Sequence, residues 1–152
     1  MARLARIVVP GFPHHVTARG NRREPIFFED GDQDIYCDML AEQIRKAAVE
    51  VWAYCLMPNH VHLILRPADR NGLGRALGAA HRRWANFING RGRWRGHLFD
   101  GRFASVAMDE RHFLSAVRYV RSIRFVHALS GAPRNGNGPA SVRISTAGMT
   151  AS

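Results

Sequence analysis

The sequence predicts an α+β fold of the ferredoxin-like kind, in which the order β-α-β-β-α-β forms one antiparallel sheet and an additional C-terminal helix follows. Three observations predict it. Strand-like and helix-like segments alternate along residues 1–129, two of the strand-like segments meet at a Pro-Asn turn, and the longer segments repeat apolar residues at helical spacing. In such a fold the helices pack on one face of the sheet and leave the other face available for a ligand.

The first elements are a strand, a polar loop and a helix. His14–Arg19 is a short strand candidate, and the polar loop runs from Gly20 to Gly31. Asp30 or Asp32 can cap a helix that continues to about Val49. This helix would present one apolar face, formed by Tyr36, Leu40, Ile44 and Ala47.

The later elements are a hairpin, a long helix, a strand and a last helix. Pro58-Asn59 is typical of a turn, and the aromatic-rich segment before it and the apolar segment after it favour two antiparallel strands. The elements predicted are strands at Val51–Met57 and His60–Arg66, a helix over Gly72–Asn89, a strand at Arg102–Met108 and a helix from Asp109 to about Leu129. The long helix follows from the spacing of Leu73, Leu77, Ala80, Trp84 and Phe87.

A chain of 152 residues accommodates one domain, which we expect to span residues 1–129. Residues 130–152 consist mainly of Gly, Pro, Ser, Ala, Asn and Thr, a composition that predicts a disordered low-complexity tail. No apolar run approaches the ~20 residues of a membrane span, and no secretory leader pattern is visible. Two cysteines, Cys37 and Cys55, are too few for a disulfide scaffold or a cysteine zinc site. We therefore expect a cytoplasmic protein with no membrane partner.

The charge is concentrated in one part of the chain. Of the 22 basic residues 21 are arginine, against 12 acidic residues, and the net charge is −1 over residues 1–58 but +11 over residues 59–152. An excess of arginine can also follow from a GC-rich coding sequence, although such a cause does not explain the clustering. A field of one sign attracts polyanions, so nucleic acid is the leading expected partner and a membrane surface a distant second.

Two histidines form the first candidate for a metal site. His60 and His62 lie two residues apart on a predicted strand, so both imidazoles project from the same face. Two adjacent imidazoles are half of a divalent metal site. The spacing alone is equally consistent with a metal site and with a pair of hydrogen-bonded structural histidines. A structural role is the one expected of His14, His15, His97 and His112.

Four blocks in the same order resemble the HUH single-tyrosine transposases, particularly the REP-associated tyrosine transposases of bacteria. The blocks are FPHHVT at residues 12–17 with RGNRR at 19–23, CLMPNHVHL at 55–63, GHLFDGRF at 96–103 and RYV at 118–120. The resemblance implies a nuclease that acts on single-stranded DNA, often folded into a hairpin, and forms a covalent 5′-phosphotyrosine. Such a protein would act as a monomer or homodimer.

The same resemblance implies roles for individual residues. Tyr119 would be the nucleophile on the last helix, and His60 and His62 would hold Mg²⁺ or Mn²⁺. Tyr36 and Tyr54 are more consistent with packing. The residues expected to contact DNA are Arg19, Asn21, Arg22, Arg23, Arg82, Arg83 and Arg102. The Arg19–Arg23 loop has two equally supported interpretations, a turn that contacts phosphates and a basic loop that is only solvated.

One position departs from the family pattern. The residue four positions after the tyrosine is usually an asparagine that can complete the metal shell, but here it is Ile123, which has no ligand atom. A DNA-binding module that kept the fold and lost the chemistry is therefore the alternative function. A small zinc hydrolase is much weaker, because no Glu-x-x-His motif or third close ligand is visible.

Overall fold

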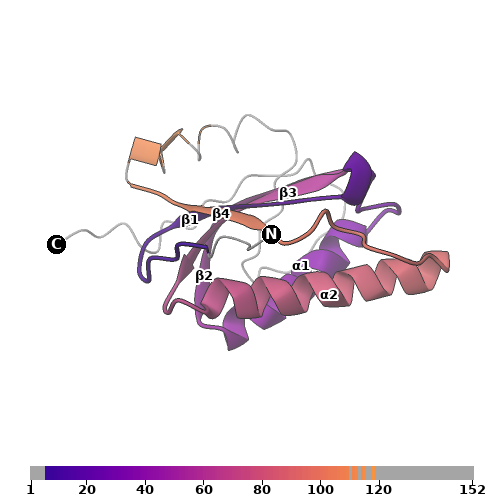
Figure 1. Ribbon diagram of the computed structural model, residues 1–152, viewed down its shortest axis with the longest axis horizontal. Helices are drawn as coiled ribbons and strands as arrows, with labels where there is room; N and C mark the ends of the chain where they lie inside the picture. Colours follow the sequence, from indigo (N-terminus) through magenta and orange to yellow (C-terminus); the bar gives the residue numbers. More distant parts are fainter. Residues whose placement is uncertain (1–5, 110, 113, 116–117, 119–152) are drawn as a thin grey trace, which may run out of the picture.

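The computed structural model describes residues 6–109, 111, 112, 114, 115 and 118. Four strands form one antiparallel sheet in the order β2-β3-β1-β4, and the helices α1 and α2 lie together on one face of it (Figure 1). This arrangement confirms the predicted fold class. The elements are β1 (His14–Arg19), the short 3-10 helix η1 (Asn21–Arg23), α1 (Asp32–Lys46), β2 (Val49–Met57), β3 (His60–Pro67), α2 (Gly72–Gly92) and β4 (Ala104–Ala107).

The first helix differs from the prediction at both ends. Gly31, with a φ of 88°, occupies the N-cap position without a side-chain cap, so neither Asp30 nor Asp32 caps the helix as expected. The helix ends at Lys46 because Ala48 turns into the left-handed region, with a φ of 53°. The chain therefore enters β2 at Val49, two residues earlier than the pattern predicted.

The later elements also shift at their ends. The helix α2 extends beyond Asn89 to Gly92 and terminates where Arg93 adopts a left-handed conformation, with a φ of 53°. The strand β4 is shorter than the predicted Arg102–Met108 and pairs with β1. Helical backbone returns at the described residues Arg111, His112, Leu114, Ser115 and Arg118. The rest of the predicted last helix, Tyr119 and the predicted tail lie outside the described residues.

The hydrophobic core fills the space between the sheet and the two helices. Trp84 of α2 is fully buried, and its indole Nε1 donates a hydrogen bond to the carbonyl of Ile26 at 2.9 Å. Phe27 and Tyr36 pack against the same indole, with ring centroids 5.6 and 5.7 Å away. Among the helices described here, none is long and apolar enough to cross a membrane.

An ion pair with a buried carboxylate connects the start of α1 to the end of α2. Asp32 is only 1% exposed, and its two carboxylate oxygens each accept a hydrogen bond from Arg91 at 2.8 Å. One of these oxygens also accepts the backbone N–H groups of Phe28 and Glu29. The bonds from Arg91 are the main cause that lowers the pKa of Asp32 to about 2.

Candidate functional site

Three histidines lie together on the sheet face that points away from the helices. Val61 of β3 belongs to the core, so the alternation of side chains places its neighbours His60 and His62 on the opposite face. Their ring centroids are 4.9 Å apart and their planes are nearly perpendicular. Thr17 of β1 pairs with His62, and His15, two residues before Thr17, shares this face.

His15 is the member of this group that sequence reasoning missed, since it was expected to be a separate structural histidine. Its Nε2 lies 3.0 Å from Nδ1 of His62, and the two rings stack with centroids 5.2 Å apart. The signal that could have found it is the register of β1 against β3, which local sequence patterns do not specify. By contrast, His14 has the expected structural role, because its Nε2 accepts the backbone N–H of Val9.

The tautomer of His60 follows from its neighbour Asn59. The amide nitrogen Nδ2 of Asn59 donates to the carbonyl of Arg23 at 3.1 Å, which orients the Asn59 carbonyl oxygen Oδ1 as the acceptor. This oxygen lies 2.7 Å from Nδ1 of His60, so Nδ1 carries the proton and donates it. The lone pair of His60 is therefore on Nε2, the atom through which a histidine with this partner binds a metal.

The surroundings of all three histidines favour the neutral form. Burial is the main cause that lowers the pKa of His62 to about 4, and the electrostatic interaction with Arg19 and with a protonated His15 or His60 lowers it further. Burial also lowers the pKa of His15 and of His60, with a second contribution from Arg19 at His60. A neutral imidazole is the form that binds a metal ion. Within the part of the chain that the structure describes, no group of three or more His, Cys, Asp or Glu side chains is placed to hold one ion.

The basic loop after β1 lies beside these histidines. Arg19 is the last residue of β1 and pairs with His60 across the ladder. Arg22 and Arg23 follow in η1 with φ values of 54° and 60°, and the bond from Asn59 to the carbonyl of Arg23 ties this turn to the start of β3. The structure thus brings three of the expected DNA-contacting arginines to the edge of the histidine site.

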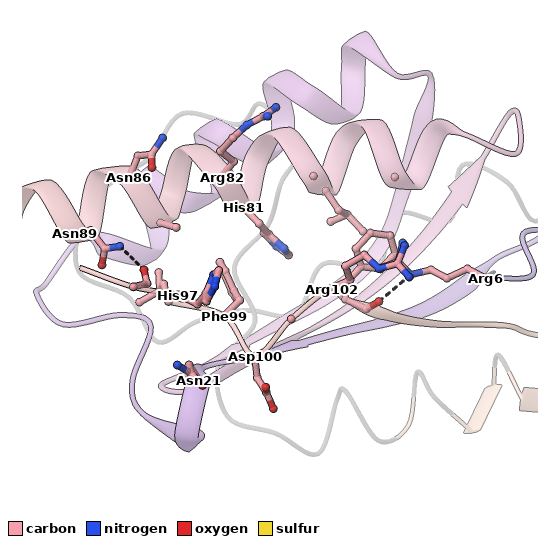
Figure 2. Close-up of a pocket in the computed structure, with 18 residues that line it drawn as sticks. Arg6, Asn21, His81, Arg82, Asn86, Asn89, His97, Phe99, Asp100 and Arg102 are labelled. Atoms are coloured by element: carbon pink, nitrogen blue, oxygen red, sulfur yellow. Dashed lines mark hydrogen bonds between the residues drawn. The ribbon is translucent and has the colours of Figure 1, made fainter. Parts of the chain in front are cut away.

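A groove of about 770 Å³ lies between α2 and the segment 96–103 (Figure 2). Its polar lining comes from Arg6, Asn21, His81, Arg82, Asn86, Asn89, His97, Asp100 and Arg102. Three of these residues, Asn21, Arg82 and Arg102, were expected to contact DNA, and they come from three separate segments of the chain. Arg83 does not join them, because its guanidinium donates to Glu42 of α1 at 2.7 Å.

Specific contacts hold the walls of the groove in place. Asn89 of α2 donates to the carbonyl of Gly96 at 3.0 Å, and Arg6 donates to the carbonyl of Phe103 at 2.9 Å, both drawn in Figure 2. His81 projects from α2 and stacks on Phe99, with ring centroids 4.4 Å apart. Burial lowers the pKa of His81 to about 4, so this ring is neutral near pH 7.

The groove and the histidine site meet at the end of β1. The backbone N–H of Asn21 donates to the carbonyl of Leu98 at 2.8 Å, and that of Asp100 donates to the carbonyl of Arg19 at 2.8 Å. The groove wall is therefore bonded directly to the strand end that borders His60.

The three tyrosines fall in different places. Tyr36 and Tyr54 are buried in the core, as expected from their positions. The hydroxyl of Tyr36 lies 2.8 Å from Nε2 of His81, and burial raises its pKa. Tyr119, the expected nucleophile, lies outside the described residues.

The solved structures that share this fold include two transposases. One is described as a REP-associated tyrosine transposase bound to a REP hairpin; it has a TM-score of 0.58 and 17% identity, over 79% of this chain and 70% of that chain. The other is a candidate transposase from Deinococcus radiodurans R1, with a TM-score of 0.54 and 19% identity over 80% and 97% of the two chains. No curated protein matches the sequence.

The family model described as "Transposase IS200 like" matches residues 9–122, a range that includes the sheet, both helices, the histidines and Tyr119. Together with the fold, this match defines the chain as a transposase. It belongs to the IS200-like transposase family, which confirms the resemblance drawn from its four sequence blocks.

Proposed function

We propose that this transposase cuts and rejoins a single DNA strand, with Tyr119 as the nucleophile and a divalent metal ion bound by His60 and His62. The observation that carries the proposal is the paired imidazoles, whose Nδ1 atoms are engaged by Asn59 and His15 respectively. For His60 this engagement leaves the lone pair on Nε2, the atom that would bind the metal. For His62 the same assignment holds when its Nδ1 donates to His15.

The donor set fits Mg²⁺ or Mn²⁺ when oxygen ligands complete the shell, because these hard ions prefer oxygen and phosphate groups supply it. Bound there, such an ion would polarise the scissile phosphate and stabilise the charge that develops on it. The protein contributes two neutral, oriented imidazoles. Arg19 beside them adds a positive charge for the DNA backbone.

The chemical step follows from the resemblance that assigns Tyr119. The phenol oxygen of Tyr119 attacks the phosphorus, the bond from phosphorus to the 3′ oxygen breaks, and the leaving 3′ oxygen takes up one proton, equivalent to the one the phenol loses, to become a 3′-OH. The product is a 5′-phosphotyrosine, which conserves the bond energy so that a 3′-OH can reverse the reaction without ATP. A phenol with a pKa of about 10 is a weak nucleophile, so charge stabilisation at the phosphate is needed.

The DNA partner is proposed to be single-stranded or hairpin DNA. The basic groove supports this, because Asn21, Arg82 and Arg102 line it together. A solved structure of the same fold is bound to a REP hairpin, which supports a hairpin as the form bound here. Arg19, Arg22 and Arg23 would contact the backbone nearer the histidines.

A second candidate function is a protein that binds such DNA without cutting it. Ile123 supports this candidate, because an isoleucine stands where the family offers a polar ligand. Losing one such contact at a metal could slow the reaction by about 10- to 100-fold. The wild type separates the two candidates, since a slow reaction supports the first and no reaction supports the second. Ile123→Asn should then accelerate the reaction if the missing polar ligand is what limits it.

The test is a covalent adduct that survives denaturing gel electrophoresis after incubation with a labelled hairpin and Mn²⁺. The wild type is expected to form it, Tyr119→Phe to lose it while still binding the hairpin, and His60→Ala with His62→Ala to lose both the adduct and Mn²⁺ binding in calorimetry. An adduct that persists in Tyr119→Phe would contradict the assignment of the nucleophile. Unchanged Mn²⁺ affinity in the double variant would contradict the metal site.

A further inference from the structure

An exposed tryptophan stands just beyond the end of α2. Trp94 is 50% exposed, although tryptophan is a side chain that proteins usually cover to a greater extent. Phe28, from the loop before α1, is 43% exposed and lies beside it, with ring centroids 4.9 Å apart. The two rings border a pocket of about 570 Å³.

The position of the indole is determined by the backbone around it. The N–H of Trp94 donates to the carbonyl of Asn89 at 2.9 Å, which closes the last turn of α2. A Cβ on Gly92 would lie only 2.6 Å from the indole ring, so glycine at this position lets the ring lie directly over the helix end. On the other side, the backbone of Phe28 is held by the buried carboxylate of Asp32. The ring pair is therefore built into the fold.

The charges around the ring pair favour an anion. Arg93 and Arg95 flank Trp94 in the chain and line the same pocket, against one acidic residue, Glu24. Three residues, Asn89, His97 and Leu98, line both this pocket and the basic groove, so the two are adjacent. A ligand with a polyanionic backbone and flat apolar groups fits both features.

We propose that Trp94, supported by Phe28, is a stacking platform for an unpaired base of single-stranded DNA whose backbone continues into the groove. This inference rests on the proposed function, because it adds a base-contacting site to the same DNA. Stacking of an aromatic ring on a base tolerates any sequence, since every base has a π-face. Arg93 and Arg95 would contact the phosphates on either side of the stacked base.

The test compares two labelled strands of about 12 nucleotides, a length within the range that single-strand sites cover. One strand is oligothymidylate, and the other has the same backbone with abasic sites throughout. Fluorescence anisotropy with the full chain is expected to show that Trp94→Ala weakens binding of oligothymidylate by about 5- to 100-fold and leaves binding of the abasic strand unchanged. Trp94→Phe, which keeps a ring, should bind within about 3-fold of the wild type.

Two further variants make the experiment specific. Phe12→Ala removes an aromatic side chain that is 54% exposed but lies outside the pocket, and it should bind both strands like the wild type. Gly92→Ala keeps Trp94 but displaces its ring, and it should weaken binding of oligothymidylate selectively.

Two results would overturn the inference: equal binding of oligothymidylate by Trp94→Ala and the wild type, or an equal loss on both strands. If the wild type still binds a hairpin and forms the Tyr119 adduct, either result removes the platform alone. If the wild type binds no single strand and no hairpin, the proposed function fails together with the platform.

Discussion

Nε2 of His15 lies 3.0 Å from Nδ1 of His62, across the ladder between β1 and β3. This contact joins two histidines that are 47 residues apart in the sequence and orients the ring of His62 from the neighbouring strand. A metal bound through Nε2 of His62 requires the proton on Nδ1, where His15 can accept it. His15 is therefore a positioning residue for the proposed metal site.

We expect His15→Ala to lower the affinity for Mn²⁺ by about 10- to 100-fold, because His62 loses the partner that sets its tautomer and ring orientation. Isothermal titration calorimetry measures this directly and does not depend on cleavage. His112→Ala serves as the control, since the side chain of His112 is 76% exposed and its contact is with Asp109. Equal Mn²⁺ affinity in His15→Ala and the wild type would remove His15 from the site.

The affinity for single-stranded DNA should fall with salt. With about 4–6 phosphate contacts, the logarithm of the association constant is expected to decrease with log salt at a slope of roughly −3 to −4. Arg82→Ala and Arg102→Ala should each make this slope shallower by about 0.7, because each removes one released counterion from the groove. Arg45→Ala removes an exposed arginine at the end of α1 and should leave the slope unchanged. A slope near zero in the wild type would rule out a phosphate-binding groove.

Asp32→Asn should destabilise the fold by about 1–3 kcal/mol, because it replaces the buried carboxylate that accepts hydrogen bonds from Arg91 and from two backbone N–H groups. Urea unfolding at pH 7 measures the loss. The control is Asp69→Asn, which breaks a carboxylate–arginine pair with the same N···O distance of 2.8 Å but about half exposed side chains. That exposed pair should contribute much less, because solvent screens it. Similar losses of unfolding free energy in the two variants would show that the burial of Asp32 adds nothing to the stability that its ion pair contributes.

The same carboxylate makes stability depend on acid. The pKa of Asp32 is about 2 in the folded protein, below its ordinary value of 3.8. The stability that it contributes is therefore present above pH 3.8 and is lost as the pH falls towards 2. In Asp32→Asn, unfolding followed between pH 5 and pH 2 should lack this part of the pH dependence.

His81 should make the fold less stable between pH 6.5 and about 4. Its folded pKa is about 4 and its ordinary value is 6.5, so the unfolded chain binds more protons in this window and stability falls as the pH falls. The expected slope is up to about 1 kcal/mol per pH unit from this one group. His81→Gln should have a shallower slope by that amount in urea unfolding at pH 7, 6 and 5. An identical slope would mean that His81 titrates normally.

The order of the elements could be predicted from the sequence because each depends on local patterns. Apolar spacing identified α1 and α2, and the Pro58-Asn59 turn identified the hairpin of β2 and β3. The ends were less predictable where tertiary contacts decide them. Aspartate is a residue type that often caps helices, but the carboxylate of Asp32 accepts hydrogen bonds from Arg91, which lies 59 residues later in the sequence.

The candidate site was predictable only in part for the same reason. His60 and His62 are two residues apart, so strand alternation alone places them on one face. His15 joins them through strand register, and the groove combines Asn21, Arg82 and Arg102 from segments whose packing no local pattern describes. Tyr119, the domain limit near residue 129 and the choice between monomer and homodimer stay predictions.

The junction at the end of β1 has a consequence for how a target would be chosen. Arg19 borders His60, and the backbones of Arg19 and Asn21 are bonded to the groove wall, so the histidines and the groove cannot change their separation without breaking these bonds. DNA anchored in the groove would then always present the same phosphate, counted in nucleotides from its anchor, to the imidazoles. The cut position would then be set by its distance from the anchored nucleotides and not by the bases at the cut. One nucleotide inserted between the anchor and the cut would move the break by one position in the DNA sequence.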